Sequence, residues 1–217
     1  DVYKRQKYFW PLLYFKGFYQ SERFFADMAD DIRKAFTFNP SLSNRKTKEM
    51  SEQIDHDENA VSIHVRRGDY LEPKYWKTTG CVCQLPYYLN AIAEMNKRIS
   101  QPSYYVFSDD IAWVKENLPL PKAFFIDWNK GTESWQDMML MSRCRHHIIC
   151  NSTFSWWGAW LNPRENKTVI MPERWFRHCE TPDICPDKWI KVPINQPDSI
   201  QSVSYTHLRA HETSAHL

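Results

Sequence analysis

The residues best suited to chemistry are Arg66, Arg67, Gly68 and Asp69, which directly follow an apolar segment. Apolar and polar side chains alternate along residues 60–66, and this period of two is typical of a strand with one buried face. The two guanidinium groups offer planar sets of N–H donors that match a phosphate, and a glycine lets the backbone turn closely. Because α/β sheets bind ligands beyond the carboxyl ends of their strands, we expect a phosphate to bind here.

Two other interpretations of this charged run stay open. An arginine could pair with Asp69 in an ordinary surface ion pair. The run Arg67-Gly68-Asp69 also spells an integrin-binding tripeptide and would then indicate adhesion. That tripeptide is common by chance, and here it directly follows a core strand, so we favour the phosphate interpretation.

Acidic residues follow or flank two further segments. Asp109 and Asp110 come directly after the apolar stretch 104–108 and begin a helix-like segment. Acids at a helix start are frequent caps and interact well with the helix dipole, so capping and ligand contact are both open. Asp137 lies among methionines on the helix-like segment 134–143, where it is either simply exposed or faces a polar partner such as a ligand edge.

A turn rich in hydroxyl groups follows the apolar segment 147–150 and begins a helix rich in tryptophan. Its candidate residues are Ser152, Thr153, Phe154 and Ser155. Free backbone N–H groups and hydroxyl groups at a helix N-terminus bind anions well. Simple N-capping, with the tryptophans as core residues, is the alternative.

The elements that position these clusters alternate regularly along the chain. Strand-like segments are 60–66, 104–108, 123–127, 147–150 and 168–171. Helix-like segments are 86–99, 109–117, 134–143 and 154–161. This alternation predicts an α/β fold with a parallel sheet and helices on both faces.

The region before the first strand divides into two parts. Apolar residues at helical spacing predict an amphipathic helix, and these are Phe24, Phe25, Met28, Ile32 and Phe36. Residues 39–59 are polar and predict a connector or an exposed helix.

Composition excludes several classes of protein. The formal net charge is only +2, so the chain offers no general surface for polyanions and nucleic acid is not an expected partner. No apolar run approaches the roughly 20 residues that cross a bilayer. The six cysteines fit no zinc-binding spacing, and Cys144 and Cys150 lie in an apolar segment as expected core residues. We expect a cytoplasmic protein, either free or peripherally associated with a membrane, and no metal site.

Both ends of the chain are expected to be foreign to the natural protein. Residues 1–6 and 202–217 follow no core pattern and resemble translated sequencing-adapter sequence. The natural protein is therefore expected to begin earlier than this chain.

Taken together, these motifs resemble the α-1,2-fucosyltransferases of glycosyltransferase family eleven, and the bacterial branch in particular. The resemblance runs from about residue 14 to residue 192. It is carried by four stretches: His64-Val65-Arg66-Arg67-Gly68-Asp69-Tyr70, Phe107-Ser108-Asp109-Asp110, Asp137-Met138-Met139-Leu140-Met141-Ser142 and Asn151-Ser152-Thr153-Phe154-Ser155-Trp156-Trp157-Gly158-Ala159-Trp160-Leu161. The first and the last are highly specific.

The resemblance implies a GT-B architecture, in which two Rossmann-like domains face a cleft. Residues 59–175 would form the domain that binds GDP-β-L-fucose, and residues 176–201 a C-terminal segment. Residues 7–58 would be the remnant of an incomplete N-terminal acceptor domain with its connector. The implied reaction transfers fucose, with inversion, to the 2-hydroxyl of a galactose-containing glycan, without a cofactor or an essential metal. The family's Gly-Asn-Gln-Met-Phe-like turn is absent from this chain, which could therefore be inactive as a fragment.

The same resemblance assigns roles to the candidate residues. Arg66 would grip the diphosphate from the loop that also holds Arg67 and Gly68, and His64 would lie beside the guanosine. Asp137 would read the N–H edge of guanine. Ser152, Thr153 and Ser155, with Phe154 between them, match the phosphate-side turn, while Asp109 and Asp110 would shape the donor pocket. Asp69 is the carboxylate nearest in sequence that could act as a catalytic base, although it could equally orient the arginines.

Two other functions remain open. Asp55-His56-Asp57 spells the acidic pair of metal-dependent glycosyltransferases, although it precedes the first strand rather than following one. The chain could also bind a nucleotide sugar without turnover.

Overall fold

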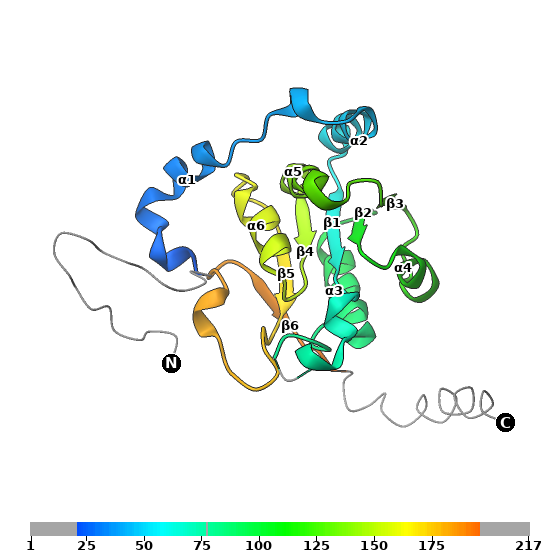
Figure 1. Cartoon of the computed structure of the whole chain (residues 1–217), viewed down its shortest axis with the longest axis vertical. Helices are drawn as coiled ribbons and strands as arrows, with labels where there is room; N and C mark the ends of the chain where they lie inside the picture. Colours follow the sequence, from blue (N-terminus) through cyan, green and yellow to red (C-terminus); the bar gives the residue numbers. More distant parts are fainter. Residues whose placement is uncertain (1–20, 77, 196–217) are drawn as a thin grey trace.

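The computed structural model describes residues 21–76 and 78–195. The expected foreign ends and the aromatic residues 7–20 lie outside the described residues. The strands are β1 (Ala60–Val65), β2 (Ser103–Ser108), β3 (Ala123–Ile126), β4 (His146–Ile148), β5 (Val169–Pro172) and β6 (Ile190–Val192). They form one sheet of order β3-β2-β1-β4-β5-β6, in which every pair of neighbours is parallel (Figure 1).

The strand order reverses once, between β1 and β4. The chain builds outward from β1 to β3 on one side and from β4 to β6 on the other. Open sheets of this kind leave a crevice at the carboxyl ends of the two strands where the order reverses, which we call the switch point. The predicted parallel sheet is confirmed. Strand β6 was not predicted, because its three residues hold only Ile190 and Val192 as apolar positions, too few for a period to be recognised.

Helices cover both faces of the sheet, as predicted (Figure 1). The helices are α1 (Ala29–Ala35), α2 (Arg45–His56), α3 (Leu85–Arg98), α4 (Ile111–Asn117), α5 (Trp135–Arg143) and α6 (Thr153–Leu161). Short 3₁₀ turns are η1 (Glu22–Phe24), η2 (Ala26–Met28), η3 (Pro40–Leu42), η4 (Asp69–Leu71), η5 (Pro73–Tyr75), η6 (Gly131–Glu133) and η7 (Pro182–Ile184). Helices α3 and α4 pack on one face, and α2, α5 and α6 contribute to the cores on the other.

The alternation along β1 assigns its side chains to these two faces. Val61, Ile63 and Val65 are fully buried in the core that α3 and α4 cover. Ser62 and His64 point to the opposite face and are also buried. Because both faces of a parallel sheet are covered, even the polar side chains of a central strand must find partners inside the protein.

Ser62 finds its partner on the neighbouring strand β4. Its Oγ lies 2.8 Å from Nδ1 of the buried His147, whose Nε2 lies 2.8 Å from the Asn162 amide nitrogen. That amide nitrogen also donates to the Cys144 carbonyl at 2.9 Å, so it is the donor toward Nε2. His147 therefore carries its proton on Nδ1 and donates it to Ser62. This buried chain of hydrogen bonds joins β1 to β4 beside the switch point.

The region before β1 differs in part from its prediction. The polar segment 39–59 contains α2. Asn44 caps its N-terminus, because Asn44 Oδ1 accepts from Thr47 N at 2.9 Å. The helix buries Ile54 against the sheet. The predicted amphipathic helix is only the seven residues of α1, preceded by two 3₁₀ turns.

The predicted apolar face of this helix is wrong for three residues. Phe25 is buried among the tryptophans of α6, but Phe24, Met28 and Phe36 are about half exposed. A 3₁₀ turn has three residues per turn rather than 3.6. Phe24 and Met28 lie in such turns, so their side chains point away from the face that an α-helix would give them. Residues 21–38 run along the outer side of α6 (Figure 1).

Candidate functional site

The loop after β1 is held in place by a carboxylate from the end of β2. Asp109 accepts the backbone N–H of Arg67 through Oδ1 at 2.9 Å and that of Gly68 through Oδ2 at 3.1 Å. A Cβ added to Gly68 would lie 2.8 Å from Asp109 Oδ2, closer than real Cβ atoms approach an oxygen. Position 68 is therefore restricted to glycine by the approach of Asp109.

The guanidinium group of Arg66 contacts two carboxylates of the protein through its Nε atom. Nε donates to Asp69 Oδ1 at 2.8 Å and lies 3.4 Å from Asp109 Oδ2. Burial opposes the charge, but the hydrogen bond that Arg66 donates to Asp69 and the negative charge of Asp109 outweigh it and raise the pKa of Arg66. Within residues 21–76 and 78–195 the guanidinium makes no other hydrogen bond, and 39% of the side chain is exposed. Nη1 and Nη2 are thus available to an anionic ligand.

Arg67 points in another direction and is bound to α4. Its Nε donates to Asp110 Oδ2 at 3.1 Å, and its Cζ lies 4.0 Å from the centre of the Trp113 ring, a cation–π contact. The other oxygen of Asp110 accepts from Trp113 N at 3.1 Å and caps α4. Asp110 is therefore a helix cap, one of the two roles that the sequence left open, and Arg67 anchors the loop.

The two loops at the switch point are tied to each other. The Tyr70 hydroxyl donates to the Asn151 carbonyl at 3.1 Å, which joins the loop after β1 to the loop after β4. The buried Asn151 amide donates to Thr79 O at 2.8 Å and to Trp175 O at 3.0 Å. The guanidinium group of Arg66 therefore lies in a loop that hydrogen bonds connect to its neighbours. This loop is at the switch point, where parallel α/β sheets bind ligands.

At the start of α6 the hydroxyl groups differ in direction. The Ser155 hydroxyl is buried and bonds to the carbonyls of Ser152 and Cys150 at 3.2 and 3.4 Å. Ser152 is also buried and makes no side-chain cap of the helix, whereas Thr153 is exposed. In this structure the Ser155 hydroxyl shapes the turn, and Thr153 is an exposed residue of the motif.

His64 lies near the end of β1, beside Cys150 and Phe154. Burial and the nearby charge of Arg66 lower the pKa of His64 to about 3, so its ring is neutral near pH 7. Nδ1 lies 3.3 Å from the Cys150 thiol, whose pKa burial raises to about 12. The ring is 5.8 Å from that of Phe154. Near pH 7 His64 therefore has no positive charge with which to bind a phosphate.

Asp137 lies in the first turn of α5, half-buried, and is bound to a residue that the sequence analysis missed. Its Oδ1 accepts from Asn129 Nδ2 at 2.7 Å. Burial raises the pKa of Asp137 to about 7, and the Asn129 hydrogen bond works against that rise. Asn129 Oδ1 in turn accepts from Asn44 Nδ2 at 2.7 Å and from Thr47 Oγ1 at 3.2 Å. A signal for Asn129 was present, since it is a polar residue shortly after β3.

The acidic pair Asp55 and Asp57 lies at the amino-terminal ends of the strands, opposite to the switch point, because it comes just before β1 begins. Asp55 forms an ion pair with Arg143. Asp57 accepts from Asn59 N at 3.0 Å and from the Tyr105 hydroxyl at 3.1 Å. Across the described part of the chain, no group of three or more His, Cys, Asp or Glu side chains is placed to hold a metal ion. The geometry gives the metal-dependent interpretation no support from this pair.

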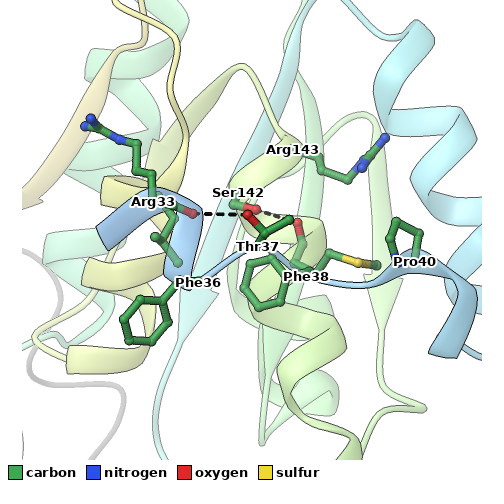
Figure 2. Close-up of a pocket in the computed structure, with 9 residues that line it drawn as sticks. Arg33, Phe36, Thr37, Phe38, Pro40, Ser142 and Arg143 are labelled. Atoms are coloured by element: carbon green, nitrogen blue, oxygen red, sulfur yellow. Dashed lines mark hydrogen bonds between the residues drawn. The ribbon is translucent and has the colours of Figure 1, made fainter. Parts of the chain in front are cut away.

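A separate hollow of about 220 Å³ lies between the segment after α1 and helices α5 and α6 (Figure 2). It is lined by Arg33, Phe36, Thr37, Phe38, Pro40, Met139, Ser142, Arg143 and Leu161. The two hydroxyls are engaged with nearby carbonyls, Thr37 with Arg33 and Ser142 with Met139. The arginine head groups point away from each other in Figure 2. This hollow therefore has no set of converging polar groups.

The described residues contain no helix that is long and apolar enough to span a bilayer. All six cysteines lie within these residues and carry free thiols, and Cys144 and Cys150 are buried core residues, as predicted.

The sheet order defines a Rossmann-like α/β domain. The family model described as glycosyl transferase family 11 matches residues 5–192. The chain belongs to this family, which confirms the resemblance found in the motifs.

Relatives of known function agree with this assignment. An α-1,2-colitosyltransferase of Escherichia coli is 37% identical over 82% of this chain and 62% of its own length. The O-antigen biosynthesis glycosyltransferase WbnK of Escherichia coli is 33% identical over 81% of this chain and 59% of its own length. Galactoside α-(1,2)-fucosyltransferase 1 of Ateles belzebuth is 31% identical over 70% of this chain and 43% of its own length. The chain thus spans about 60% of the length of its bacterial relatives.

Proposed function

We propose that this chain is the donor-binding part of a galactoside α-1,2-fucosyltransferase that uses GDP-β-L-fucose. Membership of glycosyl transferase family 11 and the names of the relatives support the reaction class. The observation that carries the proposal is Arg66, which follows β1 at the switch point and uses Nε alone for hydrogen bonds within residues 21–76 and 78–195. Colitose is the alternative sugar, because one bacterial relative is named for its transfer.

In the proposed reaction the 2-hydroxyl oxygen of a galactoside attacks the anomeric carbon of fucose from the side opposite to GDP. The bond from that carbon to the phosphate oxygen breaks, and GDP leaves with the electron pair, so the configuration inverts. Negative charge grows on the departing diphosphate, and a guanidinium group placed there in advance stabilises it. The hydroxyl proton passes to a base or to water.

The remaining residues would support donor binding in distinct ways. His64, neutral and buried, would contact the guanosine, and Asp137 would accept hydrogen bonds from the N–H edge of the base. The backbone at Thr153, in the first turn of α6, would add N–H donors and the helix dipole at the phosphates. Because Arg66 would place a positive charge at the diphosphate, we propose that the reaction needs no divalent cation.

Isothermal titration calorimetry with GDP tests the role of Arg66. We expect Arg66→Ala to weaken GDP binding by roughly 10- to 100-fold, because a hydrogen bond to a charged group contributes about 1.5–3 kcal/mol. Arg98→Ala is the matched control, because Arg98 is an exposed arginine at the C-terminal end of α3, paired with Glu94. Equal GDP affinity of Arg66→Ala and the unaltered chain would refute the proposed site.

Incubation with GDP-fucose and a galactoside separates the remaining alternatives. Formation of a 2-linked fucoside, identified by NMR, supports the transferase. GDP binding without transfer favours the interpretation as a binding protein without turnover. Transfer that is abolished by chelator and restored by manganese would instead indicate the metal-dependent reaction.

A further inference from the structure

We propose that Asp69 and Asp109 are positioning residues that together fix the guanidinium plane of Arg66, and that Asp69 does not act as the catalytic base. This inference rests on the proposed function, in which Arg66 binds the diphosphate. It assigns roles to two carboxylates whose part in the reaction the sequence left open.

Asp109, at the end of β2, connects that strand to the loop after β1. Its carboxylate accepts both backbone N–H groups of the loop, at 2.9 and 3.1 Å, and one of its oxygens lies 3.4 Å from Arg66 Nε. A group bound to two adjacent peptide N–H groups cannot rotate independently of them. The end of β2 therefore sets both the path of the loop and the position of the negative charge that faces Nε.

Asp69 lies three residues after Arg66 in the same loop and holds the guanidinium group from a second direction. Its Oδ1 accepts from Arg66 Nε at 2.8 Å, and the pair is about one-third exposed. With Nε bound on this side, the planar guanidinium has its Nη1 and Nη2 edge left for the ligand. Tyr70 lies under the group, with Arg66 Cζ 5.9 Å from the ring centre. Three side chains thus determine one orientation.

Orienting Arg66 and removing the acceptor proton are different roles, and Asp69 cannot perform both well. If Asp69 took the proton of the acceptor hydroxyl, its carboxylate would become neutral and its bond to Arg66 would weaken. That loss would come at the moment when the diphosphate charge is largest and Arg66 is most needed. Proton removal and support of Arg66 therefore conflict in one carboxylate, and the observed hydrogen bond identifies the role that Asp69 has.

The experiment compares Asp69→Asn with Asp69→Ala in the full chain. The amide oxygen of asparagine can still accept from Nε, whereas alanine removes the acceptor. We expect the affinity for GDP to stay within about 5-fold in Asp69→Asn and to fall by about 30-fold in Asp69→Ala, because misplacing a binding group by 1 Å costs up to about 100-fold. Asp109→Asn keeps one acceptor for two N–H groups, and we expect an intermediate loss.

NMR of the arginine Nε–H groups provides a readout that is independent of GDP. We expect an Arg66 Nε–H signal that exchanges slowly with water in the unaltered chain and in Asp69→Asn, and that is lost in Asp69→Ala. Arg98→Ala identifies an unrelated surface arginine signal. Circular dichroism melting of each variant shows whether a loss of affinity comes from unfolding, in which case the Asp69→Asn and Asp109→Asn results decide.

The outcomes are distinct. Unchanged GDP affinity in both Asp69 variants, with an unchanged Arg66 signal, overturns the positioning role while leaving the proposed function intact. So does a kcat loss of 100-fold or more in Asp69→Asn at normal GDP affinity, the size expected for a lost general base. No GDP binding by the unaltered chain removes the proposed function and this inference with it.

Discussion

Asp137 gives the sharpest test of the site's electrostatics, through the replacement Asp137→Asn. In the folded protein burial raises the pKa of Asp137 from 3.8 to about 7. Between these two values the folded state binds a proton that the unfolded chain has released, so the free energy of unfolding falls as pH rises through this window. Asparagine has the same shape and no proton to lose, so the variant lacks this contribution.

The size of the effect follows from the shift. A shift of about three pKa units at about 1.36 kcal/mol each sets an upper value of about 4 kcal/mol, and partial exposure of Asp137 reduces the expected difference to roughly 2–3 kcal/mol. Relative to Asp137→Asn, the unaltered chain should therefore lose roughly this amount of stability between pH 4 and pH 8, and most of it between pH 5 and pH 8.

Urea unfolding followed by circular dichroism at several pH values measures this difference. Asp187→Asn is the control, because 91% of the Asp187 side chain is exposed. It should follow the unaltered chain at every pH. If Asp137→Asn and the unaltered chain lose stability in parallel between pH 5 and pH 8, the carboxyl is not buried as described and the reasoning fails.

Two further predictions concern the frame of the site. Ser62→Ala removes the acceptor of the His147 Nδ1 proton and should lower the free energy of unfolding by about 1–3 kcal/mol in urea titrations. Ser103→Ala is its control, since the buried Ser103 hydroxyl has no hydrogen-bond partner in the described structure, and its loss should be neutral or slightly stabilising. Gly68→Ala forces Asp109 to move and should weaken GDP binding by about 10-fold or more in calorimetry, with little change in overall circular dichroism. Native GDP affinity in Gly68→Ala would show that the loop tolerates a side chain there.

Prediction from sequence succeeded where the signal was local. The strand at residues 60–66 was found because apolar residues alternate there, the strand at 104–108 because it is a short apolar stretch, and helix 86–99 because it lies between two such strands. The observed bounds differ by one residue or so at each end. The specific motifs at residues 64–70 and 151–161 also sufficed to recognise the family, which the match over residues 5–192 confirms.

Prediction failed where position depended on distant contacts. Sequence gave the adjacent residues Asp109 and Asp110 the same two possible roles, yet one binds the loop after β1 and the other caps α4. Asn129 was missed because its partners, Asn44 and Asp137, come from separate helices. The exposure of Phe24 and Met28 was missed because both lie in short 3₁₀ turns rather than in an α-helix.

By itself, the amino-acid sequence determined the class of fold, the family and the residue types available at the ends of the strands. These follow from periodicity and from short motifs, which need only neighbouring residues. The tertiary structure alone decided that Arg66 is the more exposed of the two arginines, with 39% of its side chain accessible against 22% for Arg67, because Arg67 packs on Trp113 of α4. Hydrogen-bond partners that are distant in sequence become neighbours only when the strands pair.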